Sequence, residues 1–157
     1  MSHWLDKFCQ GLEFLMALLM ATMVVLVFGN VVLRYGFNSG ITVSEELSRW
    51  LFVWMIFLGA VVGIKEHAHL GTDVLVSRLG AKGKRACLVI SQLAMLYTTW
   101  LIFSGSLAQA RISLDVQAPA SELSMAWVSG AAVVFALLAA PLLLRDLWRV
   151  LSGRAGP

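Results

Sequence analysis

The side chains that could bind a metal ion or act as a nucleophile are few and scattered along the chain. His67 and His69 form an H-x-H pair, and Asp73 is the nearest further side chain that could extend a ligand set. Cys9 and Cys87 lie far apart in the sequence and form no CxxC pattern. No nucleophile elbow, HExxH, P-loop or GxGxxG motif occurs. We therefore predict no enzyme activity, no catalytic residue, no cofactor-binding residue and no metal site.

The densest set of charged side chains lies in the motif SEELSR. Ser44 can cap the start of a helix, and Glu45 and Glu46 then lie in its first turn, where the helix dipole favours negative charge. Arg49 follows Glu45 by four residues, a spacing that favours an ion pair on one helix face. Arg34, just beyond the preceding apolar run, is expected at the same level and could pair with Glu46.

Two interpretations of these charges stay open. They could be capping and interfacial charges with no further role. Alternatively, they form a polar cluster that fixes the first two helices and a partner surface. The predicted cluster contains Asn30, Arg34, Glu45, Glu46 and Arg49.

The elements that must position these side chains are indicated by the composition. Apolar residues make up 59% of the chain and charged residues 13%, against about 45–50% and about 25% in soluble domains. The mean hydropathy is +0.82. A soluble domain needs a polar surface, which this chain cannot supply, so lipid must solvate most of it. The net charge of +3 comes from basic residues placed between apolar runs, which argues against nucleic-acid binding.

Four apolar runs are long enough to cross a membrane as helices, since about 20 residues span roughly 30 Å of hydrocarbon. They cover approximately residues 12–34, 43–65, 86–110 and 123–145. The second is the weakest, because its uncharged core is short. The sequence thus predicts one all-α integral membrane domain over residues 1–157, with four transmembrane helices.

The distribution of Lys and Arg predicts the orientation. If both termini are cytoplasmic, nine basic residues lie inside and three outside. The inside set is Lys7, Lys65, Arg78, Lys82, Lys84, Arg85, Arg145, Arg149 and Arg154, and the outside set is Arg34, Arg49 and Arg111. We therefore predict that both termini are cytoplasmic.

The connection between the second and third runs carries an amphipathic pattern. Leu70, Val74, Leu75 and Leu79 share half of a helical wheel, although Arg78 falls in the same half. This pattern predicts a short surface helix on the inner membrane face, with a solvated basic loop as the alternative. His69 and Asp73 belong to this inner-surface segment.

Inside the four runs, the strongly polar side chains are Asn30 and Gln92. Ion paths through membranes usually carry carboxylates, and their absence here argues against a pump or a channel. Gly59 and Gly63 form a GxxxG motif, which permits close helix packing in lipid. Whether such faces pack within the chain or against a larger partner stays open.

The run from Asn30 to Leu75 resembles the signature region of the small membrane subunit of TRAP transporters, the DctQ-type permease. Val43 departs from the pattern, since tryptophan is common there. The matching residues are Asn30, Arg34, Tyr35, Ser44, Glu45, Glu46, Arg49, Phe52, Trp54, Leu58, Gly59, His69 and Asp73.

This resemblance implies a scaffold subunit in the bacterial inner membrane. In such systems a periplasmic binding protein captures an organic acid, typically a C4-dicarboxylate. A large permease subunit moves it inward with sodium and holds the substrate and sodium sites. The resemblance implies no cofactor, and membrane lipids and the other two components as partners. The alternative is a haem- or quinone-binding anchor of a redox enzyme, although every histidine lies outside the predicted spans.

Overall fold

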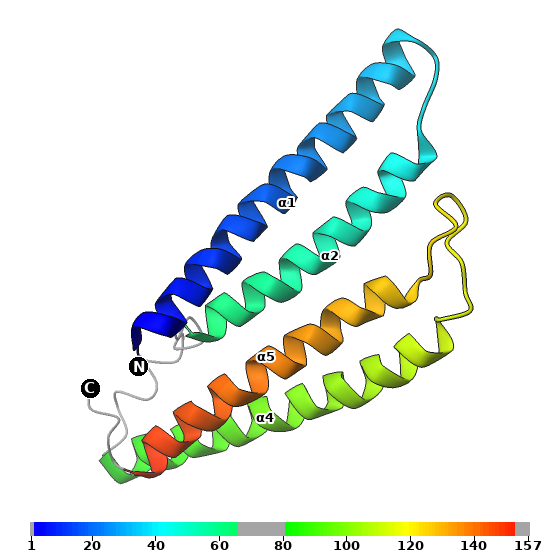
Figure 1. Cartoon of the computed structure of the whole chain (residues 1–157). Helices are drawn as coiled ribbons and strands as arrows, with labels where there is room; N and C mark the ends of the chain where they lie inside the picture. The colour runs from blue at the N-terminus through cyan, green and yellow to red at the C-terminus, as the bar shows by residue number, and fades with distance from the viewer. Residues whose placement is uncertain (1, 66–80, 153–157) are drawn as a thin grey trace.

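The computed structural model describes residues 2–65 and 81–152, which form four long helices joined in pairs by two connections at one end of the molecule, called the outer end from here on (Figure 1). The helices are α1 (Ser2–Gly36), α2 (Thr42–Lys65), α4 (Ala81–Ile112) and α5 (Ala126–Leu151). Each is long and apolar enough to cross a membrane. The predicted all-α fold with four membrane-spanning helices is confirmed. The predicted surface helix, with His69 and Asp73, lies outside the described residues.

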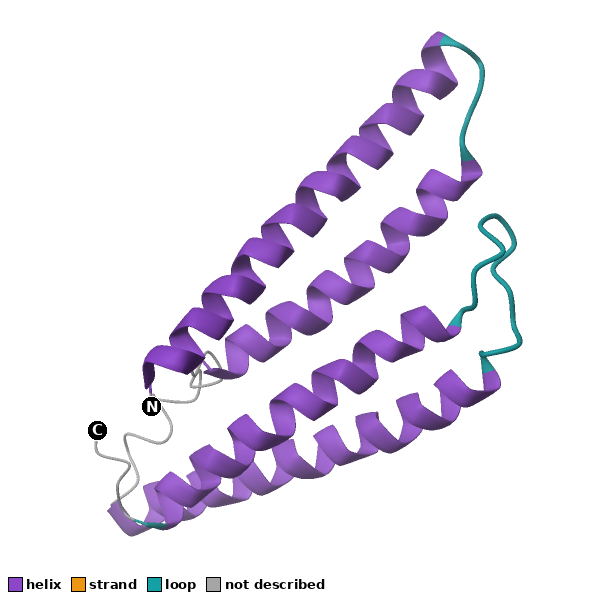
Figure 2. Ribbon diagram, in the orientation of Figure 1, coloured by secondary structure: helices purple, strands orange, loops and turns teal. Residues whose placement is uncertain are grey.

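The four helices form an open row instead of a closed bundle. Among the described helices, α1 packs on α2, α2 also packs on α5, and α5 packs on α4. The order across the row is therefore α1, α2, α5, α4 (Figure 2). Short connections make α1–α2 and α4–α5 antiparallel hairpins, and the α2–α5 contact joins the two hairpins.

The core lies along the two central helices. Leu58 and Val61 of α2 pack with Phe135, Ala136 and Ala139 of α5 in one buried cluster. The alanines let the helix backbones approach closely, which is how helices associate in lipid. The helices at the two edges of the row, α1 and α4, are less buried. In the most apolar stretch of each helix, 6% of the residues are buried in α1 and in α4, against 33% in α2 and in α5. Most residues in the apolar stretches of α1 and α4 therefore keep part of their surface exposed.

The glycine pair of α2 is used unequally. A Cβ atom built at Gly59 would lie 3.4 Å from the Met16 sulfur of α1, whereas one at Gly63 would meet nothing within 4 Å. Within the described residues, the first glycine of the GxxxG motif is therefore the one at which α1 and α2 approach each other.

We expect Gly59→Leu to lower the free energy of unfolding by about 1–3 kcal/mol, because a large side chain there must push α1 away. Gly59→Ala should be tolerated, since its methyl group fits in ordinary van der Waals contact with Met16. Gly63→Leu is the matched control. Thermal unfolding in detergent measures all three, and equal losses for the two leucine variants would contradict this account.

Candidate partner interface

The outer end of the α1–α2 hairpin is shaped by a tight turn. α1 ends at Gly36, and the Phe37 and Ser39 amides both donate to the Leu33 carbonyl oxygen, at 3.0 and 3.1 Å. Asn38 has a φ of 51°, in the left-handed region that asparagine tolerates better than most residues. The turn brings the start of α2 back beside the last turns of α1.

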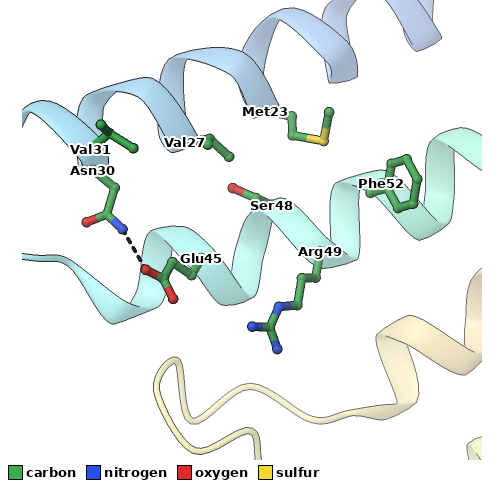
Figure 3. Close-up of a pocket in the computed structure, with 8 residues that line it drawn as sticks. All are labelled: Met23, Val27, Asn30, Val31, Glu45, Ser48, Arg49 and Phe52. Carbon is green, nitrogen blue, oxygen red and sulfur yellow. Dashed lines mark hydrogen bonds between the residues drawn. The ribbon is translucent and has the colours of Figure 1, made fainter.

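Asn30 holds this turn together from inside. Its side chain is buried, with 6% exposed. The Asn30 Oδ1 accepts a hydrogen bond from the Ile41 amide at 2.7 Å. Its Nδ2 donates to Glu45 Oε1 at 3.1 Å (Figure 3). One amide side chain thus connects α1, the turn and the first turn of α2.

Glu45 also forms a weak ion pair with Arg34. The Arg34 guanidinium lies 3.8 Å from the same Glu45 oxygen, and the two side chains are 68% and 48% exposed. An exposed pair of this kind contributes at most about 1 kcal/mol. The expected pairing of Arg34 with Glu46 is wrong, because consecutive helix residues point about 100° apart and Glu46 faces another element.

Glu46 bridges the two hairpins. One carboxylate oxygen accepts from the Ala120 amide at 3.0 Å, and the other accepts from the Ser121 hydroxyl. Both donors belong to the outer connection between α4 and α5, more than 70 residues away in the sequence. The carboxylate therefore fixes that connection against the start of α2.

The connection that Glu46 holds, residues 113–125, is itself ordered. The Ala118 amide donates to Leu123 at 2.8 Å, and the Met125 amide donates to Val116 at 2.9 Å. The reversal between them places Glu122 at a φ of 56°. Nothing in the sequence motif pointed to this loop, because its donors are a backbone amide and one serine.

Arg49 lies near Asn30 and Glu45, since all three line one groove, but within the described residues it makes no polar contact with them. It lines an open groove of about 410 Å³ between α1 and α2, together with Met23, Val27 and Phe52 (Figure 3). Its guanidinium has no hydrogen-bond or ion-pair partner in the part of the chain that the structure describes. The expected pair with Glu45 is not formed.

Ser44 does not have its expected position either. α2 begins at Thr42, so Ser44 lies inside the first turn, and its amide donates to the Ile41 carbonyl at 3.0 Å. The structure thus gathers Asn30, Arg34 and Glu45 into one group. It assigns Glu46 to a second group, and Arg49 lines the groove beside Asn30 and Glu45 without a polar contact to either. Every contact in these groups positions backbone or helices.

Residues 23–153 match the family model described as "Tripartite ATP-independent periplasmic transporters, DctQ component". Two Haemophilus influenzae proteins described as TRAP transporter small permease proteins are similar over most of their length. The first is 40% identical over 147 residues, which cover 94% of this chain and 89% of the relative. The second is 36% identical over 136 residues, which cover 87% of this chain and 81% of the relative.

A third relative is named for its substrate. The Vibrio cholerae protein called C4-dicarboxylate TRAP transporter small permease protein DctQ is 36% identical over 94 residues. The match covers 60% of this chain and 40% of that relative.

Proposed function

Because this chain belongs to the family of DctQ components, the small permease subunits of TRAP transporters, we propose that it is the non-catalytic scaffold subunit of such a transporter. The family is one of transporter components, and the proposed role includes no enzyme activity. In the proposed complex, a large permease subunit carries the substrate and the coupling ions, and a periplasmic binding protein delivers the substrate.

The single observation that carries this proposal is the open row of helices. A chain that carried cargo by itself would need to enclose a path with polar side chains. Here the described carboxylates and amide at the outer end hold helices and a loop in place, and most residues in the apolar stretches of the edge helices α1 and α4 stay at least partly exposed. Such an open row of helices is suited to widening the fixed scaffold of a larger subunit, inside which a carrier domain moves.

The substrate class and the energy source are further parts of the proposal. We propose that the complete transporter imports organic acids together with sodium ions. The name of the Vibrio cholerae relative favours C4-dicarboxylates, although the similar region covers less than half of that protein. The binding protein and the large subunit would make the selection.

The proposed location is the bacterial inner membrane, with both termini in the cytoplasm. The α1–α2 turn and the connection 113–125 lie at the same end of the molecule (Figure 1). The excess of Lys and Arg at the opposite end favours that end as cytoplasmic. The two polar groups around Glu45 and Glu46 would then face the periplasmic side.

The redox-anchor alternative predicts a visible haem spectrum for the purified chain. Family membership argues against it, and we expect a colourless protein.

Reconstitution tests the proposed function directly. Vesicles that contain this chain alone should take up no organic acid above the level of empty vesicles. Vesicles that contain the chain, the large permease subunit and external binding protein should accumulate it when a sodium gradient is applied. Uptake by the chain alone would contradict the proposed scaffold role, and so would full uptake by the large subunit without this chain.

A further inference from the structure

Two aromatic side chains with polar atoms lie exposed near the middle of α4. Tyr97 and Trp100 are 62% and 60% exposed, and their rings stack with centroids 6.4 Å apart. Both are close to the centre of the apolar stretch Arg85–Ile112. Tyrosine and tryptophan usually gather at the two membrane interfaces, where water and headgroups are within reach. At this depth, lipid tails offer nothing to their O–H and N–H groups.

Neighbouring hydroxyl groups on α4 donate hydrogen bonds to backbone carbonyls of the same helix. Thr98 donates to the Ala94 carbonyl at 3.0 Å, Thr99 donates to Met95 at 2.7 Å, and Ser104 donates to Leu101 at 3.1 Å. A second exception to the interfacial rule, Trp54 of α2, donates its indole N–H to the Trp127 carbonyl at 3.2 Å.

The two α4 aromatics differ from all of these. Within residues 2–65 and 81–152, neither the Tyr97 hydroxyl nor the Trp100 indole N–H has a hydrogen-bond partner. Buried Tyr O–H and Trp N–H groups normally find an acceptor, because an unsatisfied polar group in hydrocarbon is costly. The acceptors are therefore expected from outside the described part of this chain.

The same face of α4 also permits a close approach. Ser104 and Ala108 follow Tyr97 by seven and eleven residues, which places them on its side of the helix, and both are exposed. Gly105 lies beside them, and a Cβ there would meet nothing within 4 Å. Small residues next to large aromatic ones let another helix backbone come near in lipid. We call Tyr97, Trp100, Ser104 and Ala108 the α4 donor face.

We infer that the α4 donor face docks against a transmembrane helix of the large permease subunit that presents hydrogen-bond acceptors at mid-membrane depth. This inference rests on the proposed function, which makes that subunit the partner. Suitable acceptors are the side-chain oxygens of Asn, Gln, Ser or Thr, or a backbone carbonyl freed where a helix is broken. α4 lies at one edge of the row (Figure 1), and the residues of this face are exposed.

Two other occupants fit less well. Lipid tails have no acceptors. A second copy related by a two-fold axis would bring the same face against itself, where the side-chain acceptors are the hydroxyl oxygens of Tyr97 and Ser104, and the Trp100 indole N–H only donates. A helix of different sequence supplies the complementary groups.

Site-specific photo-cross-linking tests the inference in the intact complex. The probe p-benzoylphenylalanine is placed at Tyr97 of the chain, which is co-expressed and co-purified with the large permease subunit. Control positions are Val25 on α1 and Leu137 on α5, which are 70% and 58% exposed and lie well inside their spans. We expect a covalent product with the large subunit from position 97, several-fold above that from either control.

The outcomes separate the inference from the proposed function. If the large subunit co-purifies but cross-links from Val25 or Leu137 and not from Tyr97, the inference is overturned alone. The same holds if position 97 gives products with a second copy of the chain or no protein product. If the large subunit never co-purifies, the proposed function is overturned, and the inference with it.

A smaller change tests the hydrogen bond itself. Tyr97→Phe removes one hydroxyl and keeps the ring, so the chain should fold and the complex should dissociate several-fold faster in detergent. Thr98→Val is the matched control, because that hydroxyl is already bonded within α4. Equal dissociation rates for wild type and Tyr97→Phe would overturn the role of the hydroxyl as a donor to the partner.

Discussion

Asn30→Asp is expected to lower the free energy of unfolding of the chain by about 2–4 kcal/mol, the largest loss for any single substitution at the outer end. The new carboxylate would lie where the Asn30 amide now donates to Glu45 at 3.1 Å. A hydrogen bond would become a repulsion between two negative groups, one of them buried. The bond from the Ile41 amide would survive, because a carboxylate oxygen still accepts it.

Asn38→Asp is the matched control for this change. It adds the same charge a few residues away, at an exposed position whose left-handed backbone aspartate also tolerates. Thermal unfolding in detergent is the measurement. Similar losses for the two variants would show that added charge, and not the lost amide donor, is responsible. Asn30→Leu should also destabilise, since it orphans the Ile41 amide and frees Glu45.

Glu46→Ala is expected to release the outer connection between α4 and α5 and to cost about 2–3 kcal/mol, because hydrogen bonds to a charged group are among the stronger ones. The Ala120 amide and the Ser121 hydroxyl would both lose their acceptor. Hydrogen exchange of the Ala120 amide should accelerate about tenfold or more, since the loop would open locally without unfolding the helices. We also expect less large permease subunit to co-purify with this variant.

The control for the Glu46 prediction compares glutamine substitutions at two glutamates. Glu46→Gln and Glu122→Gln each remove one negative charge near the same loop. In Glu46→Gln an amide N–H₂ replaces one of two acceptor oxygens, whereas Glu122 is exposed. We expect faster exchange at Ala120 for the first and no change for the second. Unchanged exchange and unchanged co-purification in Glu46→Ala would contradict a bridging role for this carboxylate.

The two groups at the outer end show where reasoning from sequence succeeds. Asn30, Arg34 and Glu45 were predicted to lie together, and they do, because a short turn forces the end of one helix beside the start of the next. The partner of Arg34 was predicted wrongly, since a one-residue difference between Glu45 and Glu46 changes the direction of the side chain. Spacing along the sequence predicts which residues lie near one another, but it does not predict which pairs form hydrogen bonds or ion pairs.

The sequence alone determined the four apolar helices that the structure describes, because helix length and hydropathy depend only on which residues follow one another. It also located the polar residues at the helix ends and placed Asn30 in a recognisable motif. The tertiary structure decided the row order α1, α2, α5, α4 and the bridge from Glu46 to Ala120 and Ser121. It also decided the exposure of Tyr97 at mid-span. These features depend on which helices pack against each other. In lipid, helix association is determined by close packing and by hydrogen bonds between distant segments.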